Sequence, residues 1–211
     1  MRLRRLRHVE CTLSNDLNAQ RREQARRRAR GDRQLLGIGV STYVEITAGG
    51  NTSEFGSVQV DDDGSVTVNA GTSAHGQGHQ TSFAMIVSAQ TGIPHERIRL
   101  RAVDTDVVPS GGGTGGSRSL QLGGSAVHRA TESLVDKAKH LAAHLLEADV
   151  GDIVVDTATG TVGVAGAPTT GLDWAALATA AASTDGDIVD HSDGTTGLAA
   201  QLDFHQGDPT F

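Results

Sequence analysis

Cysteine is nearly absent from this sequence of 211 residues, in which Cys11 is the single thiol. One thiol cannot form a disulfide within the chain, and it excludes a zinc or iron–sulfur site with four cysteine ligands. Aromatic residues make up 3% of the chain, so a core must be built from Val, Ile, Leu and Ala. No apolar stretch approaches the roughly 18 residues of a membrane-spanning helix. The basic start lacks the apolar segment of a secretory signal. We therefore expect a cytoplasmic protein without a membrane partner.

Basic residues are concentrated at one end of the chain. Residues 1–33 hold 11 of the 18 Lys and Arg side chains against four acids, although the formal net charge is −7. Such an arm can bind nucleic acid through its phosphates. No aromatic residues are interleaved with the arginines and no nucleic-acid motif is present, so we expect no nucleic-acid partner. We interpret the arm as a solvated, arginine-rich helix that frays or docks on a partner subunit.

Hydrophobic periodicity predicts helices and strands in irregular alternation, with hairpins between them. Residues 1–15 are predicted to be unstructured. The expected helices are 16–30, capped by Ser14 or Asn15 and ended by Gly31; 83–90, ended by Gly92; 125–147; and 172–182. The expected strands are 35–46, 57–60 and 65–68 as a hairpin with an Asp63-Gly64 turn, 98–103, and 153–155 and 161–164 as a second hairpin. This order favours an α+β fold with a mixed sheet, hairpins and packed helices.

The longest predicted helix carries a narrow apolar seam that should face the core. Its members are Val127, Ala130, Leu134, Ala138, Leu141 and Leu145. Trp174, on the short alanine-rich helix, is expected to pack in the interior.

Two clusters of glycine, within a total of 27, mark the candidate functional site. They are His75-Gly76-Gln77-Gly78-His79 and the segment Gly111–Ser119, and each lies between a predicted strand and a predicted helix. Glycine lets a ligand approach the backbone, and amides near a helix N-terminus attract anions. Neither cluster is the dinucleotide-binding fingerprint or a Walker loop. The alternative is that the glycines only shape tight turns.

Three other groups of polar residues allow both a functional and a structural interpretation. His140 and His144 lie four residues apart and can ligate zinc, but a solvated helix face is the preferred interpretation because no third ligand is indicated. Asp104 and Asp106 can act as a catalytic carboxylate pair, but turn capping is preferred. His75 and His79 can contact a phosphate or shape the loop, and these two alternatives stay open.

Read together, three motifs resemble the large subunit of the xanthine dehydrogenase/aldehyde oxidase family of molybdenum hydroxylases, and most closely its carbon monoxide dehydrogenase-like bacterial branch. The motifs are Gly76-Gln77-Gly78-His79-Gln80-Thr81, Asp104-Thr105-Asp106-Val107-Val108-Pro109 and Gly115-Gly116-Ser117-Arg118-Ser119. The resemblance covers about Asp16 to Phe204.

The resemblance implies part of a molybdopterin cofactor-binding domain that carries molybdenum–molybdopterin cytosine dinucleotide. The pterin dithiolene would hold the metal, with Gln77 and Gly116 nearby and no metal ligand or catalytic residue from this chain. The cofactor-binding residues implied are Gly76, Gln77, Gly78, His79, Thr81, Thr114, Gly115, Gly116, Ser117, Arg118 and Ser119. Expected partners are flavin and iron–sulfur subunits.

The sequence departs from the family at Gln80, where Glu is common, and at Gly115, where an aromatic residue is common. The family's substrate-proximal loop would precede residue 1, and its active-site glutamate would follow residue 211. We therefore expect residues 16–211 to be the first half of a truncated cofactor-binding domain, which needs the remainder of the large subunit and is inactive alone. The alternative is a non-catalytic remnant that binds a phosphorylated ligand or a partner subunit.

Overall fold

The computed structural model describes residues 16–39, 46–49, 53–102, 104–183 and 188–207. The chain divides into two units, one up to Glu45 and one from Ile46 onward. Residues 1–15 lie outside the described residues, so the boundary expected there stays a prediction. No helix among the described residues is long and apolar enough to cross a bilayer.

The first unit contains helix α1 (Leu17–Arg30), which begins and ends at polar caps. The cap is Asp16, whose carboxylate accepts a hydrogen bond from the Asn18 amide at 2.8 Å, so the expected cap at Ser14 or Asn15 was wrong. Gly31 ends the helix with a left-handed φ of 67°, as predicted. None of the helix residues is buried, and surface ion pairs such as Arg27–Glu23 support it.

The strand expected at 35–46 is not formed where the structure describes it, and residues 40–45 lie outside the described part. Leu35 to Gly39 have no strand pairing, and residues 47–49 form a turn. Gly37 and Gly39 supply no side chains to pack, which weakens a strand.

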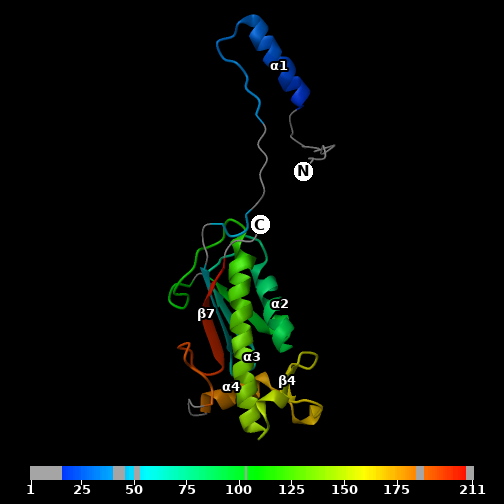
Figure 1. The fold of residues 1–211 in the computed structure, drawn as a ribbon, viewed down its shortest axis with the longest axis vertical. Helices are drawn as coiled ribbons and strands as arrows, with labels where there is room; N and C mark the ends of the chain where they lie inside the picture. The colour runs from blue at the N-terminus through cyan, green and yellow to red at the C-terminus, as the bar shows by residue number, and fades with distance from the viewer. Residues whose placement is uncertain (1–15, 40–45, 50–52, 103, 184–187, 208–211) are drawn as a thin grey trace. The chain divides into compact units, whose positions relative to one another are not determined.

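The second unit is built on two sheets, one mixed and one antiparallel (Figure 1). The larger sheet has the order β3-β2-β1-β7, with β2 and β3 parallel and the other pairs antiparallel. Its strands are β1 (Ser53–Val60), β2 (Val66–Ala70), β3 (Ile98–Ala102) and β7 (Ala199–His205). The smaller sheet consists of β4 (Ile153–Asp156), β5 (Thr161–Val164) and β6 (Leu172–Asp173). The predicted mixed sheet and both hairpins are confirmed, whereas β6 and β7 were not predicted.

Helices cover one face of the larger sheet. Helix α3 (Ser125–Leu145) packs on β1 and β7, α2 (His79–Thr91) lies beside it against β3, and α4 (Trp174–Ser183) packs at the far end of α3 (Figure 1). Gly56 lets α3 approach the sheet closely, because a Cβ there would lie 2.8 Å from Ala126. Strand alternation then decides which residues face the helices: in β2 the residues Val66, Val68 and Ala70 are buried and their neighbours are not.

The apolar seam of the long helix is confirmed except at its end. Leu134 and Leu141 are fully buried, whereas Leu145, in the last helical position, is 42% exposed. Trp174 is buried as predicted, and its indole N–H donates to the Thr91 carbonyl at 2.9 Å. Short 3-10 turns at His95–Arg97, Val150–Asp152 and Pro168–Thr170 complete the connections.

Candidate functional site

The first glycine loop joins the end of β2 to the start of α2. Gly76 and Gly78 have φ values of 103° and 75°, which only glycine adopts readily. Gly78 is the N-cap of α2, so the loop delivers the chain directly to a helix N-terminus. The amide of His75 donates to the side-chain oxygen of Gln77, which closes the loop on itself.

The second glycine loop ends in a turn of π-helix, η2 (Ser119–Gly124), which continues into α3. π-Helical turns are rare and are frequently found at functional sites. Gly113 and Gly116 have positive φ values of 67° and 53°. Ser117 has a φ of 57°, an uncommon conformation for a residue with a Cβ.

Hydroxyl groups connect the two loops. Thr72, at the base of the first loop, lies 2.8 Å from the Thr114 hydroxyl and 2.7 Å from the Ser119 hydroxyl of the second. Ser119 also donates to Thr114 at 3.1 Å. Because each hydroxyl both donates and accepts, this triangle fixes the two loops relative to each other.

The loops also touch through their backbones. A Cβ at Gly71 would lie 2.5 Å from the Cα of Gly111, a distance that no side chain tolerates. The amide of Gly113 donates to the Gly71 carbonyl at 3.3 Å. These glycines are therefore needed for close approach, while those at positive φ are needed for chain reversal.

A cavity of about 490 Å³ lies between the loops and the first turn of α2. This volume is in the range of small-molecule and cofactor sites. Its lining residues are His75, Gln77, His79, Ser82, Phe83, Thr114, Gly115, Ser117, Arg118, Ser119 and Leu120.

Arg118 is the charged group of this cavity, and it is 5% exposed. Its Nη2 donates to the Ser53 carbonyl at 2.7 Å and lies 3.0 Å from Glu54 Oε2. Its Nε and Nη1 are buried and have no hydrogen-bond partner within the described part of the chain. Leaving charged donors unpaired is expensive, which favours a site prepared for an anion.

His79 lines the same cavity as a neutral imidazole. It is 5% exposed and stacks on Phe83 with a ring-centroid distance of 5.5 Å. Burial lowers the pKa of His79, and electrostatic interaction with the neighbouring His75 lowers it further. Its Nδ1 is buried and lacks a partner among the described residues. The imidazole therefore offers a hydrogen bond rather than a charge.

The sequence-predicted site is largely assembled. Of its members, the cavity is lined by Gln77, His79, Thr114, Gly115, Ser117, Arg118 and Ser119. Gly76, Gly78, Thr81 and Gly116 do not line it, although the glycines shape its walls. The lining residues that the sequence reasoning missed are Ser82, Phe83 and Leu120. Ser82 and Phe83 directly follow the first motif in the sequence, a signal that could have identified them.

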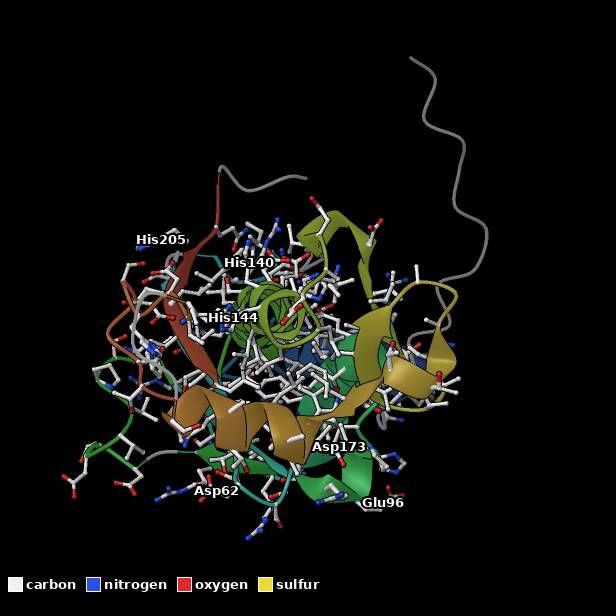
Figure 2. The ribbon with its side chains drawn as sticks, turned by 90° about the horizontal axis from the view of Figure 1, so that it is seen from below. Asp62, Glu96, His140, His144, Asp173 and His205 are labelled. Atoms are coloured by element: carbon white, nitrogen blue, oxygen red, sulfur yellow. The ribbon has the colours of Figure 1, made fainter. Side chains whose placement is uncertain are left out.

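The remaining polar groups lie outside the cavity. His140 and His144 are exposed on α3 (Figure 2). Among the described residues no three potential metal ligands gather. Asp104 caps a turn, as preferred, by accepting from the Asp106 amide at 3.1 Å.

The side chain of Gln80, one of the departures from the family motif, completes the edge of the larger sheet. It donates to the Ile98 carbonyl at 2.8 Å and accepts from the Leu100 amide at 2.8 Å. An amide can do both, whereas a carboxylate can only accept.

The residues present fit a phosphorylated heterocyclic cofactor. The guanidinium nitrogens of Arg118 that lack partners among the described residues suit an oxyanion, and the hydroxyls of Thr114, Ser117 and Ser119 make the wall of the cavity polar. Phe83 and Leu120 supply apolar surface for a ring system.

Comparison with known proteins agrees with this chemistry. Residues 11–210 match the family described as "Molybdopterin cofactor-binding domain". The carbon monoxide dehydrogenase large chain of Hydrogenophaga pseudoflava is 38% identical over 149 residues, which are 65% of this chain and 19% of that protein. A second similar protein, the nicotine 6-hydroxylase large subunit of Paenarthrobacter nicotinovorans, is 36% identical over 61% of this chain and 17% of its own length.

Solved structures show the same similarity at the level of the fold. Carbon monoxide dehydrogenase from Oligotropha carboxidovorans aligns with a TM-score of 0.68 and 29% identity, covering 92% of this chain and 25% of that one. Quinoline 2-oxidoreductase from Pseudomonas putida 86 aligns with a TM-score of 0.63 and 32% identity, covering 91% and 25%. The chain thus spans between 17% and 25% of the length of these four proteins.

Proposed function

This chain belongs to the family of molybdopterin cofactor-binding domains found in molybdenum hydroxylases, and we propose that its cavity binds molybdenum–molybdopterin cytosine dinucleotide. The observation that carries the proposal is Arg118, which lies buried between two glycine loops with two nitrogens unpaired among the described residues. A phosphorylated ligand would satisfy them.

In this proposal the residues of the chain bind and orient the cofactor and are not metal ligands. When bound, the cofactor supplies the oxidation–reduction chemistry, with its metal held by the pterin dithiolene. Gln77 and Gly116 would lie near the metal, and the amides of the first loop and the hydroxyls of Ser117 and Ser119 would meet polar atoms of the pterin and its phosphate. The other proposed cofactor-binding residues are Gly76, Gly78, His79, Thr81, Thr114 and Gly115.

The similar proteins are named as large subunits of a dehydrogenase and a hydroxylase, which supports a role for this chain in an oxidoreductase. Because the chain spans 19% of such a relative, we propose that turnover requires the rest of a large subunit together with flavin and iron–sulfur subunits, in the cytoplasm. We expect the 211 residues alone to show no hydroxylase activity.

The proposal is tested by cofactor content. The chain is expressed with its genomic neighbours in a molybdate-supplied bacterium that makes the cytosine dinucleotide form. Molybdenum is measured by mass spectrometry, and cytidine monophosphate is measured after acid release. We expect equimolar amounts of both, and an Arg118→Lys variant should retain about tenfold less, since lysine cannot form the guanidinium fork. Folded protein with neither component would contradict the proposal.

Arg129→Lys is the matched control, because Arg129 makes an exposed pair with Glu132 and should leave cofactor content unchanged. Calorimetry with cytidine diphosphate tests the second candidate, a remnant that binds a phosphorylated ligand. Binding of the nucleotide by a chain that never acquires molybdenum would favour it, and it rests on the same unpaired Arg118 donors.

A further inference from the structure

Glu54 is the least exposed charged residue of the described chain, at 2%. It lies near the start of β1, on the face that the helices cover, because it alternates with the buried Gly56 and Val58. Its Oε2 lies 3.0 Å from Arg118 Nη2. Burial raises the pKa of Glu54, while the Arg118 charge and the Gly112 amide lower it. A carboxylate this deep beside a prepared anion site requires an explanation, because its charge repels an anionic ligand.

Contacts of this carboxylate reach both glycine loops. The amide of Gly112, in the second loop, points at it with distances of 3.4 and 3.5 Å to the two oxygens. At the base of the first loop, a Cβ on Gly71 would lie 2.2 Å from Glu54 Oε1. Glu54 therefore lies where the two glycine loops contact each other.

The division of the Arg118 donors explains why the carboxylate is there. A guanidinium group has five N–H donors. Nη2 is used by Glu54 and the Ser53 carbonyl, both on β1, whereas Nε and Nη1 have no partner in the described part of the chain. Nη2 is thus fixed to the sheet, and the N–H donors of Nε and Nη1, which do not share an edge of the guanidinium group, are left for ligand oxygens.

We infer that Glu54 is a positioning residue for an oxyanion site, and that it orients Arg118 so that the Nε–H is left to bind a phosphate-type group. The inference rests on the proposed function, because it assigns the residue that shapes the same cavity. It predicts the opposite change in anion affinity from the one that charge repulsion alone would give. If Glu54 contributed only its charge, neutralising it would strengthen anion binding. If it positions Arg118, neutralising it weakens binding.

Sulfate titration of the cofactor-free chain separates these outcomes, because sulfate keeps its charge over the working pH range. Binding is followed by the NMR signal of the Arg118 Nε–H, which is assigned by its loss in Arg118→Lys. We expect a saturable shift in the wild-type chain and a dissociation constant about tenfold higher in Glu54→Gln, the effect of one hydrogen bond to a charged group. An equal or lower dissociation constant in Glu54→Gln would overturn the inference, as would the absence of any sulfate-induced shift in the wild-type chain.

Glu132→Gln is the matched control, since it removes the same charge from an exposed pair with Arg129 and should change the dissociation constant less than twofold. If Glu54→Gln does not fold, Glu54→Asp replaces it: the charge remains but the shorter side chain releases Arg118, so about tenfold weaker binding is again expected, and unchanged binding is again the overturning result. Failure of the proposed function would look different, namely normal sulfate binding by protein that acquires no molybdenum.

Discussion

The buried ammonium group of Lys137 links α3 to the segment that leads into β7. Replacing Lys137 by methionine therefore gives a quantitative test of the fold. Lys137 is 8% exposed. Its Nζ lies 2.9 Å from Asp193 Oδ2, 3.2 Å from the Thr195 hydroxyl and 2.8 Å from the Ala199 carbonyl. Ala199 begins β7, so these bonds hold the strand that pairs with β1 and thus supports Glu54.

The expected loss follows from what the substitution leaves behind. Lys137→Met would leave the Asp193 carboxylate, which is 21% exposed, without its cation. Breaking a buried ion pair costs about 3–5 kcal/mol. Asp193 keeps hydrogen bonds from the Thr195 hydroxyl at 2.6 Å and the Gln201 amide at 3.2 Å, so we expect the lower end, about 3 kcal/mol at pH 7.

The pH dependence supplies a second signature of the same pair. Burial raises the pKa of Asp193, but hydrogen bonds from Thr195, Lys137 and the Gln201 amide lower it to about 2 from 3.8. A depressed carboxyl pKa stabilises the fold above the unfolded value of 3.8, and this stability is lost as the pH falls toward 2. The shift corresponds to about 2.4 kcal/mol. Because Lys137→Met removes one of these bonds, the difference between variant and wild type should narrow below pH 3.

Urea unfolding followed by circular dichroism at pH 7, 4 and 2.5 measures both effects. Lys139→Met is the control, because it removes the same charge from the same helix at a half-exposed position. If Lys137→Met destabilises the chain no more than Lys139→Met, or if its difference from wild type is the same at every pH, the reasoning is refuted.

Three further substitutions test the loops and the sheet edge. Gly71→Ala should destabilise the chain by about 3 kcal/mol, because the added Cβ meets backbone atoms that cannot move away. Thr72→Val should cost about 1 kcal/mol, because it takes one hydroxyl from the triangle that joins the loops. Gln80→Glu should also cost about 1 kcal/mol, since a carboxylate cannot donate to the Ile98 carbonyl. Urea midpoints measure all three.

Each of these substitutions has a control or a contradicting outcome. Gly115→Ala places a Cβ where no atom lies within 4 Å, so its midpoint should stay near that of the wild type. Equal midpoints for Gly71→Ala and Gly115→Ala would show that the loops do not cross as described. Thr72→Ser, which keeps the hydroxyl, should recover most of the loss in Thr72→Val. A Gln80→Glu variant as stable as the wild type would mean that the sheet edge does not depend on this amide.

Local signals predicted the parts of the fold that depend on neighbouring residues. Asp63-Gly64 identified the hairpin because a turn with positive φ needs glycine, and Gly64 has a φ of 77°. Strand β7 was missed although its sequence alternates, because its stability comes from pairing with β1, at least 140 positions earlier. The segment 35–39 was assigned to a strand over 35–46 because that longer segment is rich in strand-forming residues and alternates at its end, yet no strand of the described sheets pairs with residues 35–39.

The residues of the candidate site also divide into those that the sequence could identify and those that it could not. The glycine loops could be found from sequence because the positive φ of Gly76, Gly78 and Gly116 depends on the residue itself. Glu54 could not be found, since nothing in a strand sequence shows that its carboxylate meets a loop 64 positions away. Chain spacing carries no information about such a contact, which exists only once β1 and the second loop are packed.

The backbone conformation of Ser117 fits the proposal that the second loop binds a ligand. Its φ of 57° is a left-handed conformation that costs about 1 kcal/mol or more for a residue with a Cβ, and glycine would avoid that strain. The two neighbouring residues already have other roles, because Gly116 forms the turn with its positive φ and Arg118 supplies the charge. A strained serine that lines the cavity is therefore best explained by its hydroxyl. The same logic applies to the unpaired nitrogens of Arg118, because strain and unsatisfied donors that gather in one loop are offset together when a ligand binds there.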